Sequence, residues 1–250
     1  MEKIIKKTPI PIAGLMLGLA GLGNLIKNYG NQYRLIAGLL SALIALILFA
    51  RFIIDHKKCK SELKNPIIAS VALTFPMGII ILSTYLIEFS YQLALYSWYT
   101  GIVLHGISIM LFSLKFINNF DIRKVFPSYF IVYVGIVVGS VTAPVFDNLK
   151  LGQLLFYFGF ISYMILLPIV FYRVFKIGEI KNVALPTIAI FTAPAGLCLA
   201  GYMSSFPQKN IFFLSWLTLL TIISIIAVLL YLPKMLSVGF YPSFSAFTFP

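Results

Sequence analysis

Long apolar runs alternate with short polar segments along the whole chain. A helix needs about 20 mostly apolar residues to cross a bilayer. The pattern predicts eight spanning helices, over residues 10–26, 34–54, 66–86, 93–117, 127–143, 150–174, 186–204 and 211–233. A ninth run opens near Tyr241, and the sequence ends at Pro250. Ten residues cover only about 15 Å of helix, so we expect either a truncated chain or a segment that re-enters the membrane.

The composition agrees with a protein immersed in lipid. Of 250 residues, 60% are hydrophobic and 10% are charged, against about 45–50% and about 25% in soluble domains. This excludes a soluble enzyme, a disordered chain and a nucleic-acid-binding module. Cys59 and Cys198 are too few for a disulfide scaffold and lack metal-ligand spacing, so no metal and no cofactor are expected. The predicted fold class is an all-α polytopic transmembrane protein.

Basic residues are distributed unevenly between the two sides of the predicted membrane domain. Fifteen of the 19 flank the N-terminus or the loops after the even-numbered spans: Lys3, Lys6, Lys7, Arg51, Lys57, Lys58, Lys60, Lys64, Lys115, Arg123, Lys124, Arg173, Lys176, Lys181 and Lys234. The opposite side has four, namely Lys27, Arg34, Lys150 and Lys209. Cytoplasmic loops are enriched in Lys and Arg. This asymmetry predicts a cytoplasmic N-terminus, in the cell membrane, so the net charge of +12 is mainly a signal of topology. Attraction of anions to the cytoplasmic side is a second interpretation of the same charges.

An internal repeat organises the spans. The odd-numbered spans are rich in Pro, Gly, Ser and Thr, and they open with Pro11, Pro66, Pro127, Pro186 and Pro242. A near-constant period indicates repeated units, here helical hairpins that start near residues 9, 65, 126, 185 and 241 within a single transmembrane domain, 1–250. The fifth hairpin is incomplete.

A second proline recurs two residues after a threonine. The copies are Thr74-Phe75-Pro76, Thr142-Ala143-Pro144, Thr192-Ala193-Pro194 and Thr248-Phe249-Pro250, and the first unit has glycines instead. A proline inside a helix frees a carbonyl and kinks the helix, and in lipid that carbonyl needs a partner. We therefore expect kinked odd-numbered helices inside and smooth even-numbered helices facing lipid.

The inner helices predict a passage for anions. All would begin on the cytoplasmic side, where the positive ends of their dipoles gather. None of the odd-numbered spans contains Asp, Glu, Lys or Arg. An uncharged conduit with positive flanks suits a monovalent anion that binds weakly, and it suits a proton-coupled transporter less well, because such proteins usually carry intramembrane carboxylates.

Two signatures resemble a known family. Asn65-Pro66 with Thr74-Phe75-Pro76, and the closing Pro242–Pro250 stretch, are similar to the tellurite-resistance/dicarboxylate transporter (TDT) family of TehA-like proteins and slow-type anion channels. The resemblance implies ten helices around a quasi-five-fold central pore, and a homotrimer with one pore per subunit. It also implies a phenylalanine that plugs the pore, which corresponds to Phe249. Eight helices and part of a ninth are present here.

The candidate site consists of the residues around these prolines. Phe249 is the predicted pore gate, with an ordinary packing role as the alternative. The pore-lining candidates are Phe75, Thr74, Pro76, Thr192, Pro194, Thr248 and Pro250. The threonine hydroxyls either face a passing anion or bond a carbonyl of their own helix.

Four further residues carry weaker expectations. His105 lies in an even-numbered span, so a neutral packing histidine is favoured over an intramembrane functional group. Glu88 is expected to be solvated, to repel anions or to pair across a subunit contact. Arg51 belongs to the densest basic patch, which topology and anionic lipid explain first. Cys198 is read as a small packing residue.

Several functions remain open at this point. The leading hypothesis is a passive channel for small inorganic or organic anions, without catalytic residues. The alternative within transport is a secondary carrier of C4-dicarboxylate, tellurite or sulfite, or an exporter of toxic compounds. A membrane-embedded enzyme is disfavoured, since no catalytic constellation occurs in the spans, and a non-transporting assembly protein is a further alternative.

Overall fold

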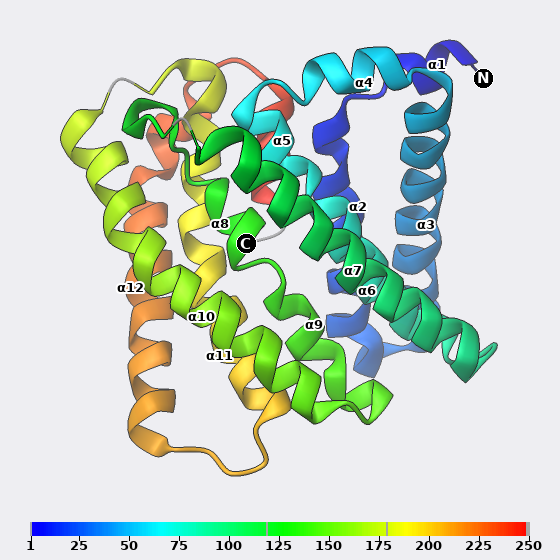
Figure 1. Cartoon of the computed structure of the whole chain (residues 1–250). Helices are drawn as coiled ribbons and strands as arrows, with labels where there is room; N and C mark the ends of the chain where they lie inside the picture. The colour runs from blue at the N-terminus through cyan, green and yellow to red at the C-terminus, as the bar shows by residue number, and fades with distance from the viewer. Residues whose placement is uncertain (1, 119, 179, 249–250) are drawn as a thin grey trace.

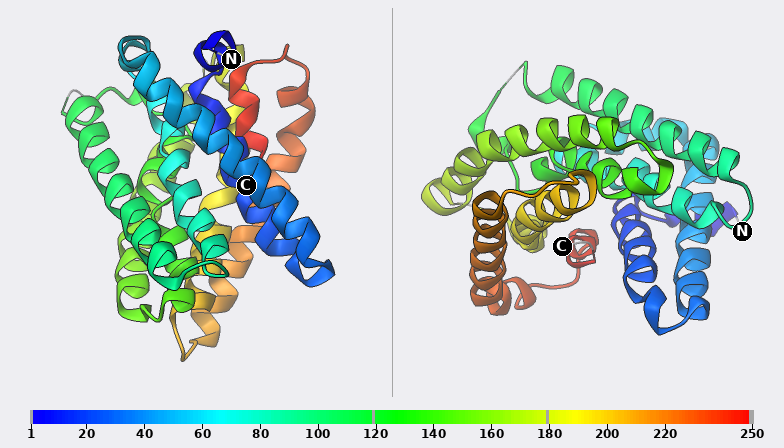
Figure 2. Two further views of the ribbon diagram at one scale, coloured as in Figure 1. Left: turned by 90° about the vertical axis from the view of Figure 1, so that its right-hand side faces the viewer. Right: turned by 90° about the horizontal axis from the view of Figure 1, so that it is seen from below.

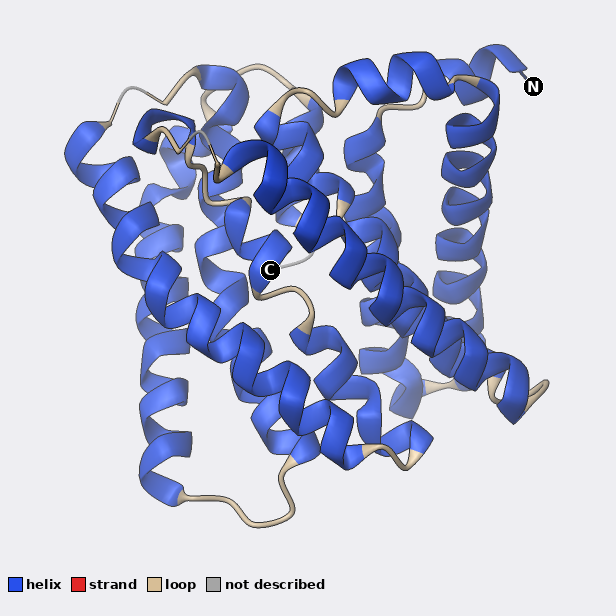
Figure 3. Cartoon of the chain, in the orientation of Figure 1, coloured by secondary structure: helices blue, strands red, loops and turns tan. Residues whose placement is uncertain are grey.

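The computed structural model describes residues 2–118, 120–178 and 180–248, and all regular structure in these ranges is helical (Figure 1, Figure 3). The elements are α1 (Glu2–Lys7), η1 (Ile10–Ile12), α2 (Ala13–Ile26), η2 (Lys27–Tyr29), α3 (Asn31–Ile54), α4 (His56–Glu62), α5 (Pro66–Ala72), α6 (Thr74–Leu86), α7 (Tyr91–Phe116), η3 (Ile122–Lys124), α8 (Tyr129–Tyr133), α9 (Val137–Thr142), η4 (Ala143–Phe146), α10 (Leu149–Phe171), η5 (Tyr172–Ile177), η6 (Asn182–Thr192), α11 (Ala193–Ser205), α12 (Ile211–Leu236) and η7 (Pro242–Phe247).

Among the described residues, seven helical stretches are long and apolar enough to cross a membrane. They are Ile10–Tyr29, Asn31–Ile54, Pro66–Leu86, Tyr91–Phe116, Leu149–Ile177, Asn182–Ser205 and Ile211–Leu236. Their bounds agree with seven of the eight predicted spans to within a few residues. The chain is therefore an all-α polytopic membrane protein, as the sequence predicts.

The fifth predicted span, 127–143, differs from the expectation of one continuous helix. A turn at residues 134–136 separates α8 from α9, and neither piece exceeds six residues. A Cβ at Gly135 would overlap the Ile131 carbonyl oxygen and press on the Met77 side chain. Glycine and its β-branched neighbours both weaken a helix. The Met77 side chain packs against Gly135 at the break, in space that a Cβ would fill.

The spans form two layers with different burial. The inner spans Ile10–Tyr29, Pro66–Leu86 and Asn182–Ser205 are 44%, 67% and 61% buried within the protein. The outer spans, which contain α3, α7, α10 and α12, are 28%, 17%, 33% and 11% buried. The outer helices therefore leave most of their apolar surface for lipid, as the even-numbered helices were expected to do.

The inner segments contact one another in a closed order. The α2 helix packs on α6, the α5–α6 pair on α8 and α9, the α8–α9 pair on η6 and α11, and η6 on η7, which returns to η1 and α2. Viewed from below in Figure 2, the red C-terminal segment accordingly lies between the yellow α11 and the blue α2. Five inner segments thus surround one axis.

Hydroxyl groups join neighbouring inner segments. Because lipid is as apolar as a leucine side chain, helices in a membrane associate through close packing of small residues and through hydrogen bonds. The bonds run from Tyr85 Oη to the Ala20 carbonyl (2.7 Å), from Ser70 Oγ to Ser128 Oγ (2.6 Å), from Ser205 Oγ to the Ser140 carbonyl (2.7 Å) and from Ser243 Oγ to the Val183 carbonyl (2.5 Å).

Two glycines of α2 form the contact that closes the ring. A Cβ at Gly14 would lie 3.0 Å from the Ser245 carbonyl oxygen, and one at Gly18 would overlap the Thr248 carbonyl oxygen. These positions, one helical turn apart, share one face of α2. The glycines that stand in the first unit where other units have Thr-x-Pro therefore let the C-terminal segment approach the α2 backbone.

Each Thr-x-Pro copy marks the end of a helical piece. The α5 helix ends before Thr74, α9 ends at Thr142, η6 ends at Thr192 and η7 ends before Thr248. In the first three copies the missing proline N–H accounts for the interruption, and Pro250 of the fourth copy lies outside the described residues. The opening prolines are less uniform, because Pro186 lies inside η6 rather than at its start.

The outer helices are not all smooth. Pro168 lies inside α10, and the following turns, η5, are π-helical. Pro233 likewise lies inside α12. The expected contrast between broken inner helices and regular outer helices therefore holds for α3 and α7 but not for the last turns of α10.

Replacing Gly18 with alanine should destabilise the protein. The added methyl group overlaps the Thr248 carbonyl, and overpacking costs about 1–3 kcal/mol. The matched control is Gly106→Ala on the outer helix α7, where an added Cβ meets nothing within 4 Å. Thermal unfolding in detergent should show a lower midpoint for Gly18→Ala and an unchanged or higher midpoint for Gly106→Ala. Equal midpoints for the two variants would contradict the close contact between α2 and the C-terminal segment at Gly18.

Candidate anion passage

A small cavity lies where the five inner segments meet. Each segment contributes at least one residue to its wall, and none of the described residues that line it is charged. The lining residues are Gly14, Val71, Thr74, Ile131, Ile190, Ser245 and Ala246. The cavity therefore lies on the axis of the ring.

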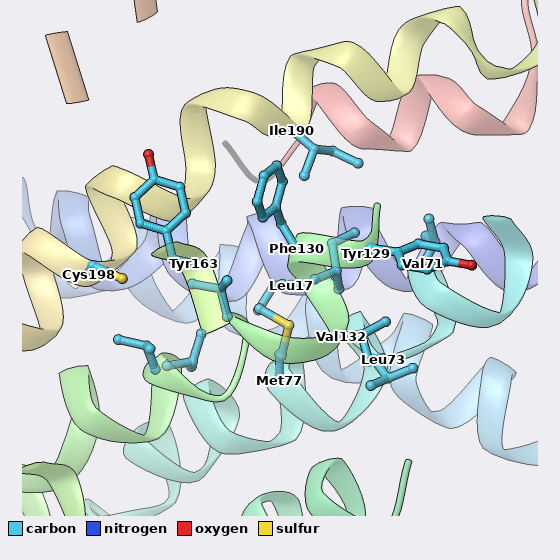
Figure 4. Packing of buried hydrophobic residues seen from close by; sticks show 14 of the residues in the cluster. Leu17, Val71, Leu73, Met77, Tyr129, Phe130, Val132, Tyr163, Ile190 and Cys198 are labelled. Atoms are coloured by element: carbon cyan, nitrogen blue, oxygen red, sulfur yellow. The ribbon is translucent and has the colours of Figure 1, made fainter. Parts of the chain in front are cut away.

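A second cavity continues from the first, since Ile131 and Ile190 line both. It adds side chains from three inner segments, among them Met77, Phe130 and Pro194. Figure 4 shows Phe130 and Met77 within the packed apolar cluster, with Ile190 beside Phe130. Each cavity measures about 10 Å³, roughly the room that one water molecule needs. The axis is therefore constricted at the level of the two isoleucines.

The threonine hydroxyls of the Thr-x-Pro copies bond their own helices. Thr74 Oγ1 donates to the Val71 carbonyl (2.7 Å), Thr192 Oγ1 to the Ala189 carbonyl (2.8 Å) and Thr248 Oγ1 to the Ser245 carbonyl (2.7 Å). A hydroxyl carries one proton. Because that proton is already donated, these groups offer no free donor to an anion, and the intrahelical reading is the one that the structure shows.

Ser245 is the hydroxyl that sequence reasoning missed. It lines the axial cavity, and its buried Oγ has no hydrogen-bond partner among the described residues. A buried polar atom without a partner costs free energy, so a ligand or water that bonds it here would be stabilised. Ser245 lies three residues after Pro242, as Gly14 does after Pro11. Because both residues line the axial cavity, their shared position in the repeat could have identified Ser245 from the sequence.

The structure places the predicted pore-lining residues in different surroundings. Thr74 and Pro194 line the axial cavities. Thr192 is half-buried at the end of η6, and Thr248 is exposed beside Gly18. Phe249 and Pro250 lie outside the described residues.

Phe75 and Pro76 line the outer surface of the ring rather than the axial cavity. Both line a groove on the outer surface, and the Phe75 ring contacts Phe52 of α3 edge-on at 6.1 Å between centroids. Successive residues of a helix point about 100° apart, so Thr74 and Phe75 face different surroundings. The described contacts give no support to the prediction that these two residues line the passage.

His105 is a packing histidine, as its even-numbered span suggested. The side chain is fully buried, and Nε2–H donates to the Val132 carbonyl at 3.0 Å in the tautomer that this bond requires. Val132 lies in α8 just before the break at residues 134–136, where regular i→i+4 bonding stops. The histidine therefore gives the broken inner helix a hydrogen-bond donor from α7.

Two charged residues have partners that the sequence did not predict. Glu88 Oε1 accepts from Arg34 Nη1 at 2.5 Å, so it is paired within the chain rather than simply solvated. Arg51 is 2% exposed and bonds Glu62 at 2.6 Å, so it does not belong to the solvated basic patch. Cys198 is buried, which agrees with a packing role.

The comparison with known families agrees with a passage for ions. The profile of the family described as voltage-dependent anion channel matches residues 8–250. The chain belongs to this family. The match confirms the sequence resemblance to a family that includes slow-type anion channels, and a comparison with curated proteins finds no match.

Membership of the voltage-dependent anion channel family establishes the general activity. The protein is a multi-pass membrane protein of the anion channel or transporter class, and small anions are what such proteins carry. The uncharged axial cavities and the unpartnered Ser245 hydroxyl are the features of the described chain that bear on how an anion would pass.

Replacing His105 with leucine should destabilise the protein without touching the axial cavities. The Val132 carbonyl would lose its donor, and an unpaired buried polar group costs about 1–3 kcal/mol. His105→Gln should recover most of that loss, since its amide N–H replaces the Nε2 donor. Thermal unfolding in detergent checks both variants, and equal midpoints for Leu and Gln would contradict the role of this hydrogen bond.

Proposed function

We propose that the protein is a passive anion channel whose conduit is the axis between the five inner segments. The quasi-five-fold pore is formed by hairpin repeats that begin near residues 9, 65, 126, 185 and 241 of a single transmembrane domain. The observation that carries the proposal is the axial cavity to which all five inner segments contribute, with a wall of uncharged side chains in the described part of the chain.

An uncharged lining supports fast passage of a monovalent anion. Conduction requires binding that is strong enough for entry and weak enough for release. A lysine or arginine in the conduit would hold the anion, and a carboxylate would repel it. The Ser245 hydroxyl supplies a neutral donor at the narrow level, where an anion has lost part of its hydration shell.

The constriction between Ile131 and Ile190 supports a closed passage in this conformation. Hydrophobic constrictions gate channels by excluding water, and these two side chains line both small cavities. Phe249 is proposed as a second gate, one residue beyond the described Thr248.

The charge distribution supports an orientation. The end of the molecule that carries α1 and α4 (uppermost in Figure 1), called the basic end below, includes Lys57, Lys58 and Lys60 of α4. By the positive-inside rule this end would face the cytoplasm, so a cytoplasmic N-terminus is part of the proposal, with the cell membrane as the proposed location. We also propose a homotrimer with one conduit in each subunit.

A secondary carrier of C4-dicarboxylate, tellurite or sulfite, or an exporter of toxic compounds, is the alternative. Coupled carriers usually place an ionisable group in the membrane as a proton or ion relay. The buried histidine His105 bonds a backbone carbonyl outside the axial cavities, which favours the channel.

Anion flux in reconstituted liposomes should follow the anion gradient alone. Because the conduit holds no ionisable side chain in its described part, an imposed proton or sodium gradient should leave the initial rate unchanged. The measurement is chloride and nitrate efflux with and without those gradients. Dependence on either cation gradient would favour the carrier.

Replacing Ile190 with alanine should raise anion flux several-fold, since it removes three carbons from the constriction. The matched control is Ile188→Ala in the same helix: Ile188 is 1% and Ile190 2% exposed, but Ile188 lines an outer groove. Phe249→Ala should also raise flux. Equal flux for Ile188→Ala and Ile190→Ala would remove the isoleucine gate, and unchanged flux for Phe249→Ala would remove the phenylalanine gate.

A further inference from the structure

A long apolar groove runs along the outer surface between α3 and α7, with α4 and the α5–α6 junction as its other walls. This α3–α7 groove has a volume of about 430 Å³, within the range of about 300–1,000 Å³ that is usual for small-molecule sites. Its aromatic lining consists of Phe52, Phe75, Phe112 and Phe116. Leu104 and Leu111 at its edge are exposed, so the groove opens towards lipid.

Two lysines stand at the groove's polar end. Lys60 of α4 and Lys115 in the last turn of α7 both line it and are exposed. Neither forms an ion pair with the residues that the structure describes. Lys115 Nζ donates to the Leu63 carbonyl at 2.7 Å, which holds the ammonium at the mouth and leaves two of its three protons free.

An equivalent groove elsewhere lacks this charge. It lies between α10 and α12 over η6, has a volume of about 410 Å³ and is lined by apolar and aromatic side chains with Ser224. Both grooves thus lie between consecutive outer helices, over the inner segment between them. None of the described residues that line the α10–α12 groove is a lysine or an arginine, so this groove serves as a natural control for the effect of charge.

We propose that the α3–α7 groove binds an anionic phospholipid, with one acyl chain in the groove and the phosphate between Lys60 and Lys115. Charge complementarity selects this occupant, because a lysine near the membrane surface attracts anionic headgroups. A zwitterionic lipid would leave the two ammonium groups without a net counter-charge. A second copy of the chain would bring its own basic end towards them.

The floor of the α3–α7 groove is formed by the outward-facing side of the inner ring. Phe75 and Pro76 line it, while Thr74, the adjacent residue, lines the axial cavity. A bound acyl chain would therefore pack against the interruption between α5 and α6. The proposed lipid site is inferred from the groove and its two lysines alone, so it does not depend on whether the protein conducts anions.

Native mass spectrometry of the full chain in detergent tests the site. Phosphatidylglycerol and phosphatidylcholine with identical acyl chains are titrated separately, and the first bound phosphatidylglycerol should be held more tightly. The double variant Lys60→Gln/Lys115→Gln should weaken that binding about 30-fold, or about fivefold per lysine. The control Lys150→Gln/Lys209→Gln removes the same charge from the opposite end and should leave binding unchanged.

A second pair of variants locates the acyl chain. Ser108→Trp fills the α3–α7 groove and should abolish tight phosphatidylglycerol binding, whereas Ser224→Trp fills the uncharged α10–α12 groove and should not. Equal binding of the two lipids, equal effects of the two lysine pairs, or no effect of Ser108→Trp would overturn the proposal. A change in oligomeric state with Ser108→Trp would overturn it too, since a second copy would then occupy the groove.

Discussion

Backbone groups that lose their helical partners inside a bilayer must find others within the protein, and the architecture depends on this constraint. Proline and glycine interrupt the inner segments at Thr74, Thr192 and residues 134–136. Side-chain hydroxyls donate hydrogen bonds to some of the freed carbonyls, and His105 donates one to the Val132 carbonyl. Because lipid offers no such partners, the interrupted segments lie inside, and the longer helices α3, α7, α10 and α12 surround them.

The same interruptions shape the axis. Small residues allow the inner segments to approach closely, as at Gly14 and Gly18 against the C-terminal segment. Close approach leaves two cavities of about 10 Å³ and a constriction at Ile131 and Ile190. Within the described residues, the proposed path is lined by uncharged side chains and includes the free hydroxyl of Ser245. An uncharged axis with basic residues towards one end fits the general activity of the voltage-dependent anion channel family.

Much of the fold could be predicted from the sequence, because spans and inner segments are encoded locally by apolar length, proline spacing and charge. The break between α8 and α9 could not, since the apolar run 127–143 is continuous and the contact of Met77 with Gly135 comes from another segment. The site was harder to predict. Phe75 shares a motif with Thr74 but faces the outer groove, and helical rotation separates them. The partners of Arg51 and Glu88 come from other segments, which a linear pattern does not show.

Cysteine modification during anion flux tests the central claim, that anions pass along the axis between the five inner segments. Single cysteines at Val71, Ile131, Ile190 or Ala246, in a background with Cys59→Ala and Cys198→Ala, are treated with a negatively charged thiosulfonate in conducting liposomes. The account predicts loss of flux at each axial position and none at the lipid-facing Leu46 or Leu111. Flux that persists after axial modification, or that is lost at the lipid-facing positions, would contradict it.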